Sequence, residues 1–248
     1  NWTAPATLIN AVQPVYAPPT AAVDSDNPAL AKKWVFFGTG RLLVQGDKTS
    51  TTTKSLYGLV DDGSVVAMAD IQDVSSIEVK TDGDLINGPV GITTFPALEN
   101  SIATTKKGWK LNLPPITGTA GVAPATRMLN QQALLGGILF SSVYQPSIDP
   151  CTSEGLSRLY GLYFRTGTAL PMPSVFGTYT DPVTGFTYSM RYVDLGFGLA
   201  TSPAIHSGSG EGDTEVSVFT QLSTGTIIRE EATTKDKVRS GRKAWRER

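Results

Sequence analysis

The stretch WVFFGTGRLL (residues 34–43) carries an apolar run into Gly38-Thr39-Gly40. A strand that enters a glycine loop begins the dinucleotide-binding fingerprint Gly-x-Gly-x-x-Gly, which opens a helix. Here Leu43 stands where the third glycine belongs, and the following VQGDKTSTTTK makes a poor amphipathic helix. We therefore interpret Gly38 and Gly40 as points where a strand bends or packs tightly on its neighbour. The unbroken apolar run predicts that Trp34, Phe36 and Phe37 are buried on both faces of a sheet.

Composition points to a chain built from strands and turns. Of the 248 residues, 40% are hydrophobic and 17% charged, below the roughly 25% charge usual for soluble domains. The net charge of −1 gives no overall basic field for nucleic acid, although residues 235–248 form a basic tail with seven Lys/Arg and two Asp/Glu. The longest apolar stretch, ALLGGILF at 133–140, is far shorter than the roughly 20 residues of a membrane-spanning helix.

Hydrophobic residues recur mostly with period two or in continuous runs, which favours strands. The expected strands cover residues 34–39, 55–60, 64–70, 75–80, 108–112, 137–144, 158–164, 186–192 and 215–222. Turn signals rich in Asp, Thr, Ser and Gly separate them, at 61–63, 81–83, 166–167, 181–182 and 223–225. The sequence predicts no long helix, and the basic tail is the one helix candidate.

An internal repeat organises these strands. Leu-Tyr-Gly-Leu occurs at residues 56–59 and again at 159–162, each time followed by a turn. A looser unit recurs three times, in which a short segment of small apolar residues (TAAV at 20–23, QQALLGG at 131–137, SPAIH at 202–206) precedes an apolar strand. Repeated antiparallel units predict an all-β, β-propeller-like fold of about three to four blades, with the two Leu-Tyr-Gly-Leu strands in equivalent positions. A β-sandwich is the alternative fold.

Several segments together resemble the C-terminal domain of the PilC/PilY family of type IV pilus tip-associated proteins. They are WVFFGTGRLL followed by SLYGLVDDG, GWKLNLP at 108–114, residues 136–162 with their Pro-Ser-x-Asp-x-Cys segment, and the closing GRKAWRER at 241–248. The order and spacing of these segments match across nearly the whole chain. Residues 1–248 are thus identified as the C-terminal part of such a propeller domain, with the basic tail 235–248 at its end.

The resemblance implies an exported protein at or near a pilus tip, on the cell surface or outside the cell, with roles in pilus assembly and adhesion. It implies minor pilins or pilus tip proteins as partners, and a surface ligand that the sequence does not name. The Asp-rich calcium loop of the family and the Gly-Asp-Leu-x-Gly-Asn strand lie upstream of the region matched here. Calcium is therefore expected in the upstream part of the domain, and no cofactor in this segment.

Candidate chemistry is sparse. The single histidine, His206, is expected at an exposed strand end, and no Gly-x-Ser-x-Gly elbow accompanies it. The single cysteine, Cys151, is either buried and free or bonded to another part of the protein. Carboxylates gather at 24–27, 81–87 and 211–213 without EF-hand spacing, so we expect solvated turns. The best candidate for a weak cation site is Asp82, Asp84 and Asn87. Trp245 is expected to dock onto the propeller, with Arg246 and Arg248 paired to acidic surface.

Two functions from different classes follow. The first is a non-enzymatic pilus adhesion and assembly factor that acts through loops and strand addition. The second is a remnant of a quinoprotein-like enzyme, which would need a cofactor pocket and a catalytic carboxylate. Another extracellular β binding module is the remaining alternative. Because the chain begins at Asn1 and three or four blades cannot close a ring, we further expect it to be a processed or truncated part of a larger propeller. Its apolar end faces are then expected to be covered by its own N-terminal portion or by another chain.

Overall fold

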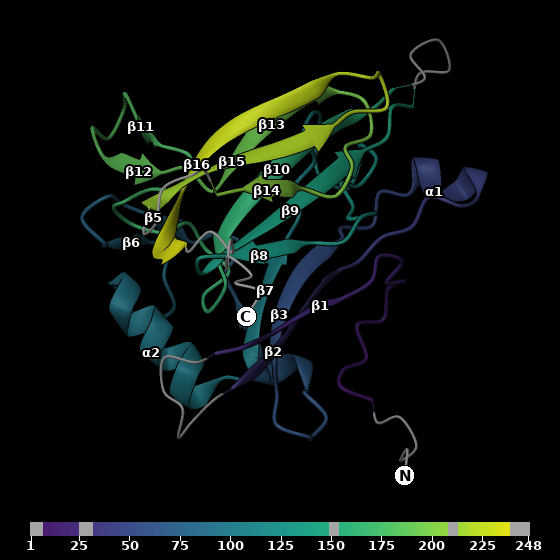
Figure 1. The fold of residues 1–248 in the computed structure, drawn as a ribbon. Helices are drawn as coiled ribbons and strands as arrows, with labels where there is room; N and C mark the ends of the chain where they lie inside the picture. Colours follow the sequence, from purple (N-terminus) through teal and green to yellow (C-terminus); the bar gives the residue numbers. More distant parts are fainter. Residues whose placement is uncertain (1–6, 25–31, 149–153, 208–212, 239–248) are drawn as a thin grey trace, which may run out of the picture.

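Three antiparallel sheets follow one another along the chain (Figure 1). The computed structural model describes residues 7–24, 32–148, 154–207 and 213–238. The first sheet has the order β1 (Thr20–Val23), β2 (Lys33–Gly38), β3 (Ser55–Asp61), β7 (Gly108–Asn112), with β4 (Gln72–Asp73) added in parallel. The second has β8 (Ala133–Leu135), β9 (Ile138–Gln145), β10 (Leu156–Tyr163) and β13 (Tyr192–Phe197). The third has β14 (Ala204–His206), β15 (Asp213–Gln221) and β16 (Ile227–Val238).

The first strands of the three sheets lie side by side. Strands β1 and β14 both contact β8, and the hydroxyl of Thr20 donates to the carbonyl of Gln132, just before β8, at 2.7 Å. These strands are the three short segments of small apolar residues that the sequence repeat identified. Successive antiparallel sheets whose first strands meet are the arrangement of propeller blades. The all-β, β-propeller-like fold is confirmed.

The two Leu-Tyr-Gly-Leu segments occupy the third strand of the first and second sheets. Gly58 in β3 pairs with Phe36, and Gly161 in β10 pairs with Phe140, so the two glycines hold equivalent registers. A Cβ on Gly58 would lie 2.4 Å from the Trp109 ring, and one on Gly161 would lie 2.7 Å from Phe176. An aromatic ring packs across the strand at this position in both sheets, so the position must be glycine. This requirement explains the glycine of the Leu-Tyr-Gly-Leu repeat.

An aromatic interface joins the first and second sheets. Trp34 and Phe36 both make edge-to-face contacts with Phe164, at 6.0 and 6.3 Å between ring centroids. Trp109 is fully buried, and its Nε1–H donates to the carbonyl of Phe164 at 2.7 Å. Trp34, Phe36 and Phe37 are all buried as predicted, with Phe37 on the opposite face, stacked on Tyr57.

Gly38 and Gly40, in the stretch 34–43, allow close packing against neighbouring side chains. A Cβ on Gly38 would lie 2.6 Å from Met128, and Gly40 has φ +137° with Arg127 directly beside it. Arg127 is buried, and its guanidinium donates to the carbonyls of Arg41 and Ala125. The chain after Gly40 forms only the short helix α1 (Gln45–Thr49), so a nucleotide-binding loop does not form there.

Four expectations about local structure were wrong. Residues 64–70 form no strand and end in a 3₁₀ helix (Met68–Asp70), and 75–80 contain only β5 (Glu78–Val79), which pairs with β6 (Leu85–Ile86). Residues 186–192 divide into β12 (Thr187–Ser189), paired with β11 (Thr178–Thr180), and the start of β13. The helix α2 (Phe95–Thr105) was missed, although Phe95, Leu98 and Ile102 give it a buried face at helical spacing.

Candidate functional site

Two insertions at equivalent points of the first two sheets form one continuous surface. The first runs between β3 and β7 and carries β5, β6 and α2, while the second runs between β10 and β13 and carries β11 and β12. Lys80 and Tyr188 form an antiparallel bridge between them, and the N–H of Thr81 donates to the carbonyl of Thr187 at 3.1 Å. Figure 1 shows β11 and β12 projecting from the sheets beside β5 and β6. We call these two insertions together the insertion surface.

A polar cluster ties this surface to all three sheets. Arg165, just after β10, binds Asp24 beside β1 at 2.6 Å and Glu99 of α2 at 2.9 Å. The hydroxyl of Tyr163 donates to Glu99 at 2.8 Å and accepts from Nζ of Lys235 in β16 at 2.6 Å. Burial alone would lower the pKa of Arg165, but its bonds to Asp24 and Glu99 raise it overall. Burial and the Glu99 carboxylate raise the pKa of Tyr163, so both groups stay protonated and the cluster is structural.

The predicted weak cation site is occupied by a lysine. Asp82 and Asp84 bind Nζ of Lys80 at 2.9 and 3.1 Å, and Asn87 instead donates to the carbonyl of Ser76. The backbone N–H of Asp84 and then Lys80 lower the pKa of Asp82. Among the described residues, no group of three His, Cys, Asp or Glu side chains is placed to hold a metal ion. A turn forms at 81–83 as expected, but residues 85–86 form β6, in which Leu85 is buried.

The other candidate residues do not converge. His206 is exposed at the end of β14, where it pairs with Ser217 of β15. Asp24 of the 24–27 cluster belongs to the Arg165 ion pair. Cys151, the rest of that cluster, Glu211 and the tail residues Trp245, Arg246 and Arg248 lie outside the described residues. Within the described ranges, no helix has the length and apolar character needed to cross a membrane.

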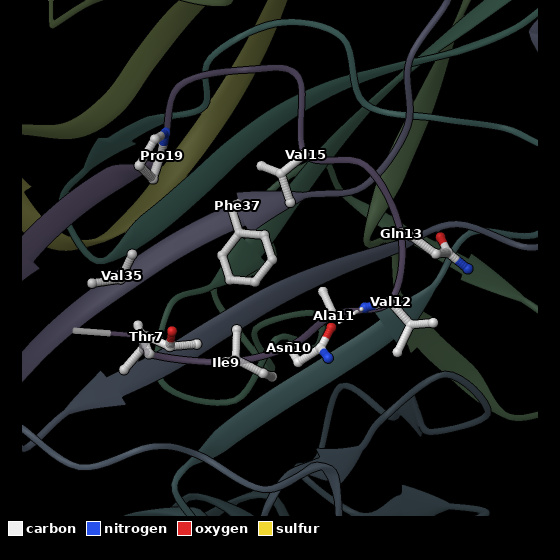
Figure 2. A pocket seen from close by; sticks show the side chains of 11 residues that line it. Thr7, Ile9, Asn10, Ala11, Val12, Gln13, Val15, Pro19, Val35 and Phe37 are labelled. Atoms are coloured by element: carbon white, nitrogen blue, oxygen red, sulfur yellow. Dashed lines mark hydrogen bonds between the residues drawn. The ribbon is translucent and has the colours of Figure 1, made fainter. Parts of the chain in front are cut away.

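An apolar groove lies on the outer face of the first sheet (Figure 2). Its volume is about 640 Å³, and it lies between the N-terminal segment 7–15 and β2, which contributes Val35 and Phe37. The segment is fastened at both ends, because the N–H of Val66 donates to the Leu8 carbonyl at 2.7 Å and that of Gly40 to the Pro14 carbonyl at 2.8 Å. Sequence patterning missed this segment because it makes no strand, although its apolar residues at 8–15 were visible.

Comparisons with known proteins agree with this fold. No family model matches the chain. A type IV pilus biogenesis factor PilY1 homolog of Xylella fastidiosa (strain Temecula1 / ATCC 700964) is 28% identical over 167 residues, which is 66% of this chain and 13% of that protein. The crystal structure of the Pseudomonas aeruginosa PilY1 C-terminal domain matches with a TM-score of 0.55 and 16% identity, over 89% of this chain and 45% of that one.

The chain therefore has the fold of a PilY1-like C-terminal domain, in agreement with the motifs at 34–43, 56–63 and 108–114. It spans about one eighth of the curated relative and less than half of the solved domain. Of the motif residues, Trp109 has the clearest structural role, since it closes the interface between the first two sheets.

Proposed function

We propose that this chain is a non-enzymatic part of a type IV pilus biogenesis and adhesion factor, exported and located at or near the pilus tip. The observation that carries the proposal is the 167-residue match to a PilY1 homolog, named as a type IV pilus biogenesis factor, together with the shared fold. We propose no catalytic group or cofactor in this chain. Calcium is assigned to the upstream part of the family's domain. Its partners are minor pilins or other pilus tip proteins.

The groove on the first sheet supports an interaction role. It presents Val12 and Val15, which are exposed, above Val35 and Phe37. In a propeller this face packs on the preceding blade, and apolar surface of this kind is where proteins associate. We assign it to the remainder of the propeller, supplied by the N-terminal portion of the same protein or by another chain.

The edge of β16 supports strand addition. From Thr233 onward, the outer edge of β16 donates hydrogen bonds to the carbonyl of Val175 in the second insertion and to that of Gly136 in the β8–β9 turn. No described strand pairs with that edge over 227–232. An extended segment of a pilin-like partner can add there through backbone hydrogen bonds, which is how many sheet edges bind peptides.

Deletion of the coding gene in the organism that encodes it tests the proposal. We expect surface pili to be lost and to return with the intact gene, as counted by electron microscopy. A complementing gene with Val15→Asp is expected to restore fewer pili, and one with Val122→Asp, the same change at an exposed valine outside both proposed surfaces, to restore them fully. Undiminished piliation after deletion would contradict the role in pilus biogenesis. An absorbance band of a bound quinone in the purified protein would contradict the non-enzymatic assignment.

A further inference from the structure

A small pocket opens where the two insertions meet. Its volume is about 150 Å³, and its lining residues come from β5 and from the hairpin and strand that end the second insertion: Glu78, Tyr179, Ser189, Met190, Arg191 and Tyr192. It is separate from the groove of Figure 2, which lies on the first sheet and the N-terminal segment. Ligand sites commonly form at such junctions between elements, with an apolar lining and a few convergent polar groups.

The back of the pocket is held rigidly. The guanidinium carbon of Arg158 lies 3.9 Å from the centre of the Tyr192 ring, and Arg158 is fixed in turn by Asp194 at 2.6 Å. The carbonyl of Arg191 accepts the N–H of Gly161 in β10 at 3.0 Å. These contacts fix one face of Tyr192 and the backbone of Arg191 before any ligand arrives, which lowers the entropic cost of binding.

The charged groups of the pocket cancel each other and keep spare hydrogen-bonding capacity. Arg191 Nη2 lies 3.3 Å from Glu78 Oε1, and Nη1 makes contacts of 3.3 and 3.4 Å to the carbonyls of Ser75 and Ile77. All three contacts are long for hydrogen bonds to a guanidinium. A guanidinium has five N–H donors and a carboxylate accepts about four bonds, so both groups can also bind a ligand.

A buried hydroxyl of the lining is unsatisfied. Ser189 is 2% exposed, and its Oγ has no hydrogen-bond partner within the described part of the chain. A buried polar atom without a partner is unfavourable, so a ligand hydroxyl that reaches Ser189 is favoured.

The ring of Tyr179 forms the solvent-exposed wall of the pocket. Tyr179 stacks on Tyr188 with ring centroids 5.2 Å apart and an interplanar angle of 24°, and it remains 46% exposed, so part of its surface is free to contact a ligand. Burial, and then the nearby Glu78 carboxylate, raise the pKa of Tyr179. Its phenol therefore stays protonated at neutral pH and remains a hydrogen-bond donor.

We propose that this pocket binds one neutral sugar unit of a glycan, whose ring lies against Tyr179 and whose hydroxyls bond to Glu78, Arg191 and Ser189. A sugar ring has an apolar C–H face that packs on an aromatic ring, and a periphery of hydroxyls that both donate and accept. This inference stands on the pocket alone and goes beyond the pilus assignment.

Other ligand classes fit less well. A carboxylate or phosphate attracted to Arg191 would meet the Glu78 carboxylate, and a cation attracted to Glu78 would meet Arg191. An apolar side chain would cover Ser189 and the ion pair without giving them partners, which is unfavourable. A neutral polyol has the mixed donor and acceptor set that this lining requires.

Saturation-transfer NMR on the intact chain tests the proposal. The probes are the methyl glycosides of glucose, galactose, mannose and N-acetylglucosamine at millimolar concentration, with sodium acetate as the anionic comparison. We expect transfer to at least one glycoside, weakened at least about tenfold in affinity by Tyr179→Ala, which corresponds to about 1.4 kcal/mol, because the stacking contact is lost. Tyr16→Ala removes another exposed tyrosine, far along the chain from the pocket, and is expected to leave glycoside binding unchanged.

A second variant tests the charge argument. Glu78→Gln leaves Arg191 without its carboxylate, so we expect weaker glycoside binding and new binding of acetate. The proposal is overturned if no glycoside shows transfer, if Tyr179→Ala and Tyr16→Ala behave alike, or if acetate binds the unaltered chain at this pocket in preference to every glycoside.

Discussion

The two end faces of the three-sheet arc are built from the same alternating pattern but differ in chemistry. On the first sheet, the outward residues Val35 and Phe37 are apolar, and the segment 7–15 partly covers them. On the third sheet, the outward residues include Ser217, Arg229 and Glu231, which bond to one another. The expectation of two exposed apolar end faces holds only in part for the third sheet. Val216 and Val218 point inward, whereas the half-buried Phe219 and the exposed Ile227 share the outward face with these polar residues.

Both sheets lie at an end of the arc, so position alone does not decide whether an end face is exposed to solvent or packs against protein. The side chains at the outward-facing positions of the strands decide it. The third sheet ends the arc with charged side chains on its outward face. The first sheet ends it with an apolar groove. Association is accordingly expected on the side of the first sheet.

The largest contrast is expected from core phenylalanines. Phe36→Ala should lower the free energy of unfolding by about 3–5 kcal/mol, because the ring fills the interface between the first and second sheets. Phe219→Ala, which truncates a half-buried ring on the third sheet, should cost less than about half as much. Urea unfolding measures both. Equal losses would contradict the placement of the main core between the first two sheets.

A smaller effect is expected at the repeated glycines. Gly58→Ala and Gly161→Ala should each cost about 1–3 kcal/mol, since the new methyl group meets an aromatic ring at 2.4 and 2.7 Å. Gly46→Ala is the control, because a Cβ there would meet no described atom within 4 Å. If either Gly58→Ala or Gly161→Ala melts at the same temperature as Gly46→Ala, the two glycines do not hold equivalent positions in their sheets.

The sequence predicted most of this framework because glycine and aromatic residues recur in register. The tetrapeptide at 56–59 and 159–162 and the short apolar segments before 34, 138 and 213 located the three sheets. It missed α2 because only Phe95, Leu98 and Ile102 mark one short face, and it missed β16 because IIREEATTKDKV has one solvent face rich in charge. The pocket at Tyr179 depends on two insertions about 100 residues apart, so no local pattern could reveal it.

The attachment of the third sheet offers a more modest test. Thr234 is fully buried, and its hydroxyl lies 3.0 Å from the carbonyl of Thr214 and 2.9 Å from that of Asp236. Thr234→Val keeps the shape and removes the hydroxyl, so we expect a loss of about 1 kcal/mol in urea unfolding. Thr234→Ser keeps the hydroxyl and should retain that hydrogen-bond contribution. A neutral Thr234→Val would show that polar contacts contribute little to holding this sheet.

The smallest effects should have opposite pH signs at Asp47 of α1 and at Glu230 of β16. The N–H of Leu43, and then Arg41, lower the pKa of Asp47 from 3.8 to about 2. Asp47 therefore stabilises the fold above pH 4, and the deficit of Asp47→Asn should vanish as the pH falls from about 4 to 2. Burial raises the pKa of Glu230 in β16, so its charge is unfavourable at neutral pH. Glu230→Gln should raise the melting temperature slightly at pH 7, and this gain should fade in acid. Matching pH profiles for the two variants would contradict these assignments.

The most direct test of the account is the association state of the 248-residue chain, measured by sedimentation velocity over a range of concentrations. We predict concentration-dependent association through the groove of the first sheet, reduced by Val15→Asp and unaffected by Val122→Asp at an exposed valine outside the groove. A monodisperse monomer at every concentration, with a cooperative thermal melt, would contradict the proposal that the outer face of the first sheet binds the rest of the propeller.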